Sequence, residues 1–393
     1  MRVVLFCHSI VSDWNHGNAH FLRGIARELI GRGHDVRIFE PRDGWSRANL
    51  VREHGTRPLA QFRRIFPELR STLYDLPTLD VDAAVDGADL VVVHEWSERE
   101  LVRAVGRARL HSGRFRLLFH DTHHRSVTAP RSMAEYDLRH YDGVLAYGRV
   151  ISELYLERGW IGRAWTWHEA ADVRLFRPVL GRERSGDLVW IGNWGDGERT
   201  AELETFLIGP ARELQLTGSV FGVRYPDEAR EALWAAGIAY RGWIANHHVP
   251  EAFARHAVTV HIPRRPYAES LPGIPTIRPF EALACGIPLV CSRWEDSEGL
   301  FTEGKDYLVA RNGREMVACF REVLHDPDLA RSLAQHGRQT ILGRHTCAHR
   351  VSELLAIAAE LGVEAGELPT AAAGLHTPTP THVYTYTTSQ EAP

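Results

Sequence analysis

The sequence predicts a two-domain α/β protein in which each domain carries a doubly wound parallel sheet. Short apolar runs alternate with amphipathic helical segments along most of the chain, an order typical of parallel sheets covered by helices. The 393 residues are too many for one ordinary core and favour two domains. A polar, arginine-rich connection at 181–186 separates two series of elements. We therefore expect one domain over 1–175, a second over 176–365, and a disordered tail rich in Ala, Thr and Pro over 366–393.

The first series opens with an apolar run at 3–6, which predicts a buried strand. A polar turn and a helix over about 18–31 follow, because Phe21, Ile25 and Leu29 recur on one helical face. The segment 32–39 ends that helix and starts the second strand. Further strands are expected at 90–93, 116–119 and 144–147, and further helices at 98–110 and 150–158.

The second series repeats this alternation after the arginine-rich connection. Its strands are expected at 187–192, 219–222, 238–240, 258–262 and 289–292. Two helical patterns, at 313–325 and 328–342, close the domain.

A short helix over 279–285 is the most informative element of this series. Pro279 suits the first helical position, and Gly286 is placed to end the helix in the left-handed conformation. Glu281 then falls in the first turn, in front of a buried strand. Because ligands of open α/β folds bind at the carboxyl ends of the strands, we expect Glu281 near such a site. The helix dipole alone also favours a carboxylate there, which is the structural alternative.

Composition excludes several classes of function. The net charge of −4 comes from interspersed acidic and basic residues, so neither a nucleic-acid footprint nor an anionic-membrane surface is expected. Lys305 is the only lysine, which excludes a P-loop lysine. The five cysteines lack paired spacing, and we expect a reduced, cytoplasmic protein. No run is long enough for a signal peptide or a membrane span.

The run Phe280-Glu-Ala-Leu-Ala-Cys-Gly-Ile-Pro-Leu-Val290 resembles the nucleotide-sugar motif of GT-B glycosyltransferases. The resemblance is to group 1 enzymes and to the CgeB-like branch, which carries Gly-Ile-Pro-Thr-Ile-Arg before this motif, as at 273–278 here. The segment 168–178 resembles the entry into the second domain of group 1 enzymes. The resemblance implies the GT-B architecture, two Rossmann-like domains that face each other across a cleft.

For the second domain, the resemblance implies a donor site. Glu281 would hold the ribose hydroxyls of the nucleotide. Many relatives carry another glutamate eight positions earlier, near the transferred sugar, where this chain has Gly273; Glu269 is the candidate substitute. Backbone groups of Gly273, Ile274 and Thr276 would face the sugar or the diphosphate.

The donor diphosphate needs positive groups, because negative charge builds on it as the sugar departs. The glycine-rich run 192–200 follows a strand and opens a helix, and its Gly192, Asn193 and Arg199 resemble the element that binds the diphosphate. Arg264, Arg265 and Arg278 are further candidates. The alternatives are an ordinary glycine-rich turn with a solvated arginine, and arginines paired with carboxylates such as Glu269.

The first domain offers two loops that would face the same cleft. Gly17 and Asn18 follow the first strand; Gly17 allows close backbone approach to a ligand, and the alternative role of Asn18 is to cap the next helix. His120 follows the strand at 116–119, and the resemblance implies a histidine near the reacting sugar. A metal site within 120–124 is the alternative, because several imidazoles and a carboxylate lie close together there.

Tryptophans such as Trp14, Trp45, Trp96, Trp194 and Trp243 fall in or near loops, where they could stack on a sugar or base or fill the core. Taken together, these features predict a cytoplasmic bacterial glycosyltransferase of the hexosyltransferase type. It would use a nucleotide-sugar co-substrate, no cofactor and no metal; the resemblance implies retention at the anomeric carbon. The acceptor stays open. The alternatives are a non-catalytic CgeB-like binding or assembly protein and a nucleotide-sugar epimerase or phosphorylase of the same fold.

Overall fold

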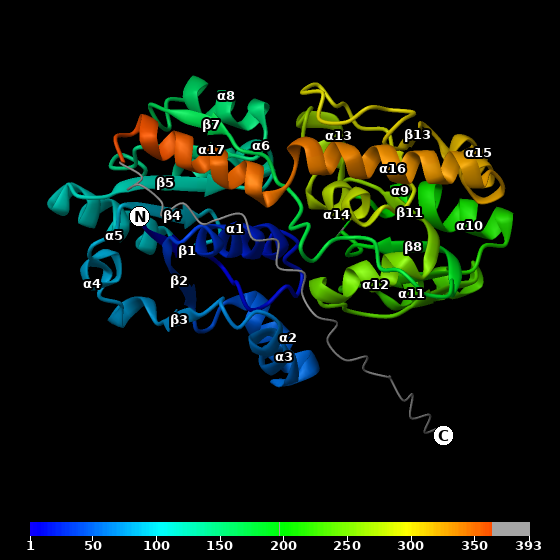
Figure 1. Ribbon diagram of the computed structural model, residues 1–393, viewed down its shortest axis with the longest axis horizontal. Coiled ribbons are helices and arrows are strands. Elements are labelled where there is room, and N and C mark those ends of the chain that lie inside the picture. Colours follow the sequence, from blue (N-terminus) through cyan, green and yellow to red (C-terminus); the bar gives the residue numbers. More distant parts are fainter. Residues whose placement is uncertain (196, 364–393) are drawn as a thin grey trace.

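The computed structural model describes residues 1–195 and 197–363 and shows two α/β domains side by side (Figure 1). Each domain has its own parallel sheet covered by helices, so the predicted fold class is confirmed. The predicted disordered tail at 366–393 lies outside the described residues. All five cysteines are free. Within the described ranges, no helix combines the length and the apolar character needed to cross a membrane.

The first sheet has seven strands in the order β3-β2-β1-β4-β5-β6-β7, and each neighbouring pair is parallel. The strands are β1 (Arg2–Phe6), β2 (Asp35–Pro41), β3 (Ser71–Tyr74), β4 (Leu90–His94), β5 (Arg116–Asp121), β6 (Gly143–Ala146) and β7 (Ala164–Thr166). The helical elements are α1 (Ala19–Gly31), α2 (Trp45–His54), α3 (Arg57–Ile65), η1 (Leu76–Thr78), α4 (Val81–Val85), α5 (Arg99–Ser112), α6 (Arg125–Thr128), α7 (Pro130–Ala134) and α8 (Arg149–Glu157).

Both faces of this sheet are buried, which explains the continuous apolar run of its central strand. Along β4, Val91 and Val93 belong to one hydrophobic core, whereas Leu90 and Val92 belong to another on the opposite face. Successive side chains of a strand point to opposite faces, so a strand covered by helices on both sides needs apolar residues at every position.

The second sheet has six parallel strands in the order β10-β9-β8-β11-β12-β13. These are β8 (Gly186–Ile191), β9 (Gly218–Phe221), β10 (Ile238–Tyr240), β11 (His256–His261), β12 (Leu289–Ser292) and β13 (Leu308–Ala310). The helical elements that follow β8 are α9 (Thr200–Leu203), η2 (Glu204–Ile208), α10 (Gly209–Leu214), α11 (Asp227–Ala235), η3 (Asn246–His248), α12 (Val249–Ala254), α13 (Arg265–Ser270), α14 (Ile277–Cys285), α15 (Gly313–His325), α16 (Pro327–Arg344) and α17 (Cys347–Glu360).

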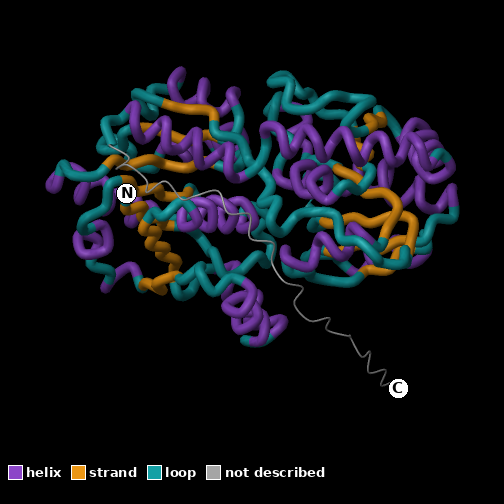
Figure 2. The backbone as a smooth tube through the Cα atoms, in the orientation of Figure 1, coloured by secondary structure: helices purple, strands orange, loops and turns teal. Residues whose placement is uncertain are grey.

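Three strands were not expected from the sequence: β3, β7 and β13 (Figure 2). Each lies at an edge of its sheet and has only three or four residues, most of them half-buried. A short edge strand buries little apolar surface, so its sequence carries little of the apolar pattern on which strand prediction relies.

The last helix, α17, returns to the first domain and packs along α1 (Figure 1). Its Cys347, Val351 and Leu354 complete the hydrophobic core that contains Phe21. Gly24 on α1 permits this close packing, because a Cβ at that position would lie 2.3 Å from Cys347 Sγ. The second domain therefore does not extend to residue 365 as expected: its own core ends with α16, and the chain links the two domains twice.

Candidate functional site

A cleft of about 460 Å³ lies between the two domains, at the carboxyl ends of both sheets. The first domain contributes the loop 15–18 after β1, together with residues that follow β4, β5 and β6. The second domain contributes residues that follow β8, β9 and β11, and the beginning of α14. Four arginines line this cleft: Arg199, Arg224, Arg264 and Arg278. Open α/β sheets bind ligands at these edges, as the sequence led us to expect.

Arg199 is held in the cleft by neutral groups. Its Nη1 donates to Ile262 O at 3.1 Å, its Nη2 donates to Asn193 O at 2.6 Å, and the guanidinium lies 5.1 Å from the Trp190 ring centre. Burial lowers the pKa of Arg199 to about 10, so the group is still cationic at neutral pH. Within residues 1–195 and 197–363, its Nε has no hydrogen-bond partner and no carboxylate forms an ion pair with the guanidinium. A buried cation whose described hydrogen-bond partners are carbonyl groups is suited to an anionic ligand.

Two further arginines predicted for the site, Arg264 and Arg265, have acidic partners. Arg264 lines the cleft and pairs with Glu198 at 2.7 Å. Arg265 points elsewhere: it is exposed, pairs with Glu202 at 3.0 Å and is not part of the cleft wall. Both arginines are therefore paired with carboxylates, as the alternative expected. Their partners are not Glu269, however, but residues that precede them by more than 60 positions.

The start of α14 is strained where it meets the cleft. Thr276 precedes the helix with φ +60° and ψ −179°, and its side chain does not cap the helix. A β-branched residue avoids this region, and such conformations cost about 1–3 kcal/mol. The first N–H groups of a helix lack intrahelical partners, so α14 directs a positive dipole end at the cleft. The expected start of this helix is wrong, because the helix begins at Ile277 rather than at Pro279.

Glu281 lies beneath the cleft wall instead of in it. Its side chain is completely buried and accepts a hydrogen bond from Arg278, which does line the cleft. Its other oxygen lies 2.8 Å from Nδ1 of His20, on α1 of the first domain. His20 Nε2 accepts from the backbone N–H of Asp172, so Nδ1 of the neutral ring carries the proton and donates to Glu281. Glu281 therefore joins the two domains and holds Arg278 in place.

Glu169 is a cleft residue that the sequence did not single out. It lies in the segment after β7, is only 5% exposed, and accepts a hydrogen bond from Asn18 Nδ2 at 2.8 Å. Burial raises the pKa of Glu169 to about 8, so most of the carboxyl is protonated at neutral pH. The alternative capping role of Asn18 is wrong, because its amide serves Glu169 instead of the α1 N-terminus. Gly17 lies beside α14: a Cβ there would be 3.3 Å from Ile277 Cγ2.

His120 does not face the cleft, contrary to expectation, and His123 does. Strand β5 continues to Asp121, so His120 is still within the strand and its ring packs against Trp167, 4.9 Å between ring centres. Burial lowers the pKa of His120 to about 3. His123 follows the strand end, lines the cleft beside Trp96, and its buried Nδ1 has no partner in the described chain.

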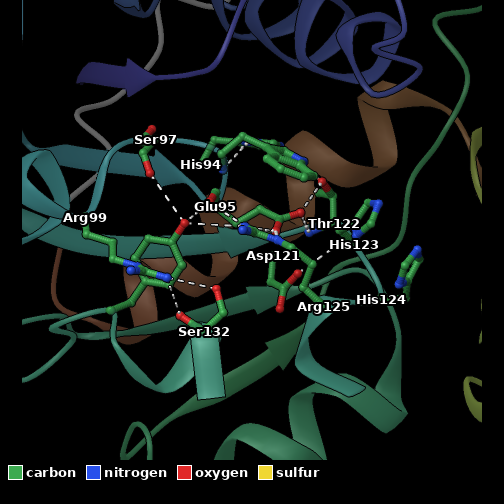
Figure 3. Close-up of polar contacts among 12 residues, drawn as sticks. His94, Glu95, Ser97, Arg99, Asp121, Thr122, His123, His124, Arg125 and Ser132 are labelled. Carbon is green, nitrogen blue, oxygen red and sulfur yellow. Dashed lines mark hydrogen bonds and ion pairs between the residues drawn. The ribbon is translucent and has the colours of Figure 1, made fainter. Parts of the chain in front are cut away.

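Two buried carboxylates support the loop that carries His123 (Figure 3). Asp121 accepts hydrogen bonds from the His123 backbone N–H at 3.1 Å and from Tyr155 Oη at 2.9 Å. Glu95, at the end of β4, pairs with Arg125 at 2.6 Å. Burial raises the pKa of both carboxyl groups. Among the described residues, no three His, Cys, Asp or Glu side chains gather closely enough to hold a metal ion, so the alternative metal site at 120–124 gains no support.

The remaining predicted site residues divide into two groups. Gly192 and Asn193 line the cleft, and Asn193 Oδ1 accepts from the Val223 backbone N–H at 2.9 Å. Outside the cleft wall lie Glu269, which is exposed on α13, Ile274, which is buried in a hydrophobic core of the first domain, and Gly273.

Gly273 has a structural reason to be glycine. Its φ is +87°, and a Cβ there would lie 2.7 Å from the Cγ of Glu298. Glu298 in turn accepts from the Arg149 backbone N–H at 2.8 Å and pairs with His168 at 3.1 Å. The carboxylate of Glu298, which joins the second domain to the first, fills the space that a larger residue at 273 would need.

Comparison with known proteins supports the same architecture. Residues 199–356 match a family described as "Glycosyl transferase-like". No curated protein matches the chain by sequence. Sucrose-phosphate synthase from Thermosynechococcus elongatus is similar in structure at 15% identity and a TM-score of 0.65, covering 92% of this chain and 99% of its own. HepE from Anabaena, solved with UDP, has 13% identity and a TM-score of 0.64, and the match covers 92% of this chain and 100% of HepE. A glycosyltransferase from Rickettsia africae has 11% identity and a TM-score of 0.64, and the match covers 92% of this chain and 98% of that enzyme. The chain has the GT-B fold, and the resemblance noted in its sequence is confirmed at that level.

Proposed function

We propose that this chain is a glycosyltransferase that transfers a sugar from a nucleoside-diphosphate sugar to an acceptor hydroxyl. The observation that carries the proposal is Arg199, a buried cation in the interdomain cleft whose described partners are neutral carbonyl groups. The family match of the second domain supports it, and so does the similarity in fold to HepE, which was solved with UDP-glucose.

The donor diphosphate would lie between Arg199, Arg264 and the N-terminus of α14. Negative charge grows on the diphosphate as its bond to the sugar breaks, and fixed positive groups in a cleft stabilise that charge. Other glycosyltransferases use a divalent ion to supply this positive charge. Here the two arginines and the helix N-terminus would supply it, so we propose a metal-independent reaction. The surrounding structure holds Thr276 in a strained conformation at the start of α14, where the helix N-terminus would face the phosphates.

Glu281 would act on the donor through Arg278. Its carboxylate already accepts from Arg278 and His20, and it lies outside the cleft wall. The direct contact with the ribose that the resemblance implies would require this completely buried carboxylate to become accessible from the cleft. We therefore propose Glu281 as a positioning residue for Arg278 in the present arrangement of the domains.

Glu169 and His123 would lie on the first-domain side of the transferred sugar. The acceptor oxygen forms a bond to the anomeric carbon, and the bond from that carbon to the diphosphate oxygen breaks with its electron pair. The acceptor proton passes to the ionised form of Glu169, which a pKa near 8 leaves populated at neutral pH. His123 offers a neutral imidazole, because burial lowers its pKa.

The test is a calorimetric panel of UDP-, GDP-, ADP- and dTDP-linked glucose with EDTA present, followed by product analysis of any donor that binds. Binding without metal, with slow release of free sugar, is the expected result, and the anomeric configuration of that sugar reports retention or inversion. Conversion of the free donor into an epimer would identify an epimerase instead. Binding without turnover would favour the non-catalytic alternative, and no binding of any donor would refute the proposal.

A further inference from the structure

A second cavity, of about 430 Å³, opens on the first domain directly beside the cleft. It lies between the loop after β2, the η1 turn after β3 and the loop after β4, at the same edge of the first sheet. Trp45 and Trp96 line both cavities, so a molecule held here reaches the cleft past two indole rings. We call this cavity the first-domain groove.

The two tryptophans in the groove wall are each held by a neighbouring side chain and still present part of their surface to the groove. The Trp45 ring stacks on His8 at 4.8 Å between centres, and Trp96 carries the Arg125 guanidinium at 4.1 Å. Both tryptophans are only partly buried and still present surface to the groove. An indole face supported in this way packs against the C–H groups of a sugar ring at little cost in side-chain entropy.

His8 supplies a hydrogen-bond donor, and its contacts determine which ring nitrogen carries the proton. The ring is 3% exposed, and burial lowers its pKa to about 4, so it is neutral at pH 7. Its Nε2 accepts from the Ser46 backbone N–H at 3.3 Å, which leaves the ring proton on Nδ1. No acceptor for this proton is found within the described part of the chain, and His8 lines the groove. A hydroxyl oxygen in the groove would complete its hydrogen bonding.

The charge of the groove is opposite to that of the cleft. Three carboxylates line it, those of Asp43, Asp75 and Glu98, against one guanidinium, that of Arg42. Arg42 pairs with Asp75 at 2.9 Å, so Asp43 and Glu98 are not neutralised by it. The Tyr74 hydroxyl donates to Glu98 at 2.7 Å and fixes that carboxylate at the groove wall. The groove therefore repels phosphates and attracts a cation, whereas the cleft, with four arginines, does the reverse.

We propose that the first-domain groove binds the acceptor, and that the acceptor is a saccharide or cyclitol that carries a protonated amine. The inference rests on the proposed function for the cleft. The acceptor ring packs against Trp45 and Trp96, the His8 Nδ1–H donates to one of its hydroxyls, and its ammonium lies against Glu98 and Asp43. A further hydroxyl extends past the tryptophans towards the donor.

The test compares amines with their N-acetylated forms. Calorimetry at pH 7, with saturating UDP and EDTA, would measure the affinities of 2-deoxystreptamine, glucosamine and the corresponding N-acetyl compounds. We expect the amines to bind about tenfold more tightly, the size of one charge-assisted hydrogen bond. Glu98→Gln should remove most of this preference without changing the affinity for UDP. Glu100→Gln is the matched control, because Glu100 is exposed at the start of α5 and does not line the groove.

Each outcome separates the two proposals. Equal affinity for the amines and the acetylated forms would overturn the cationic acceptor, and so would an amine preference that survives both Glu98→Gln and Asp43→Asn. UDP binding without binding of any saccharide would overturn the groove as a saccharide site while leaving the donor site intact. Failure of UDP and of every other nucleotide in the donor panel to bind would refute the proposed function instead.

Discussion

Replacing Glu169 by glutamine should change how the stability of the protein depends on pH. The native pKa of about 8 lies about 3.5 above the ordinary 4.5. This difference corresponds to an upper limit of about 5 kcal/mol, since one pH unit is worth about 1.4 kcal/mol. The native state holds the Glu169 proton more tightly than the unfolded chain does. Its stabilising contribution is therefore complete below pH 4.5 and is lost as the pH rises from 4.5 to 8. A glutamine side chain does not titrate and has no such dependence.

The assay is thermal melting of both proteins between pH 5 and pH 9. Other carboxyl groups titrate in both proteins, so their effects cancel in the difference between the two curves. We expect Glu169→Gln to gain stability relative to the wild type as the pH rises, by several degrees at pH 8.5, and then to stay constant. Parallel curves across this range would show that Glu169 ionises normally, and the reasoning about its burial would be wrong.

The same residue links stability to turnover. If the ionised form of Glu169 accepts the acceptor proton, the transfer rate should rise with pH through about 8 and then level off. In Glu169→Gln the rate should fall by about 10²- to 10⁴-fold without this rise, while the donor affinity stays within a few-fold. A variant with wild-type turnover would remove Glu169 from the reaction.

Three further changes test the second domain. Thr276→Gly should raise the free energy of unfolding by about 1 kcal/mol, measured by denaturant titration, because glycine tolerates φ +60°; an unchanged value would mean that no strain is stored there. Gly273→Glu, which restores the glutamate of many relatives, should lower the melting temperature instead of raising activity, because its Cβ meets Glu298; a stable, more active variant would contradict this. Glu281→Ala should cost about 3–5 kcal/mol of stability and weaken donor binding, because it leaves Arg278 without its partner; full stability would show that the buried pair is dispensable.

Most strands of the two sheets could be predicted from the sequence for a simple physical reason. Central parallel strands such as 90–93 are buried on both faces, so they appear as unbroken apolar runs between helical patterns. Edge strands such as β13 bury little and leave no such run. The return of α17 to the first domain depends on a contact between Gly24 and Cys347, which no local pattern indicates.

The candidate site was predictable where a side chain's position follows from the backbone of its own loop. Arg199 follows a strand end and a glycine-rich turn, and it lies in the cleft as expected. His120 was misplaced because β5 is two residues longer than its apolar run, so the chain reaches the cleft only after Asp121.

The contacts of Glu281 and Glu169 lay beyond local reasoning. His20 lies 261 positions from Glu281, and Asn18 lies 151 positions from Glu169. The fold alone brings these pairs together. The one signal available was that Glu169 belongs to the segment at 168–178 that resembles the link between the domains of group 1 enzymes.

Arg199 is the cation on which the proposed binding of the donor diphosphate depends most directly. The decisive measurement is the calorimetric affinity of the nucleoside diphosphate that binds best, with EDTA present, for the wild type, Arg199→Gln and Arg265→Gln. Arg265 is the matched control, an arginine of the same domain that is exposed and pairs with Glu202 outside the cleft. We expect Arg199→Gln to weaken binding by about 10- to 100-fold, the loss of a charge-assisted contact, and Arg265→Gln to leave it unchanged. Equal affinity in all three proteins would contradict the proposed donor site.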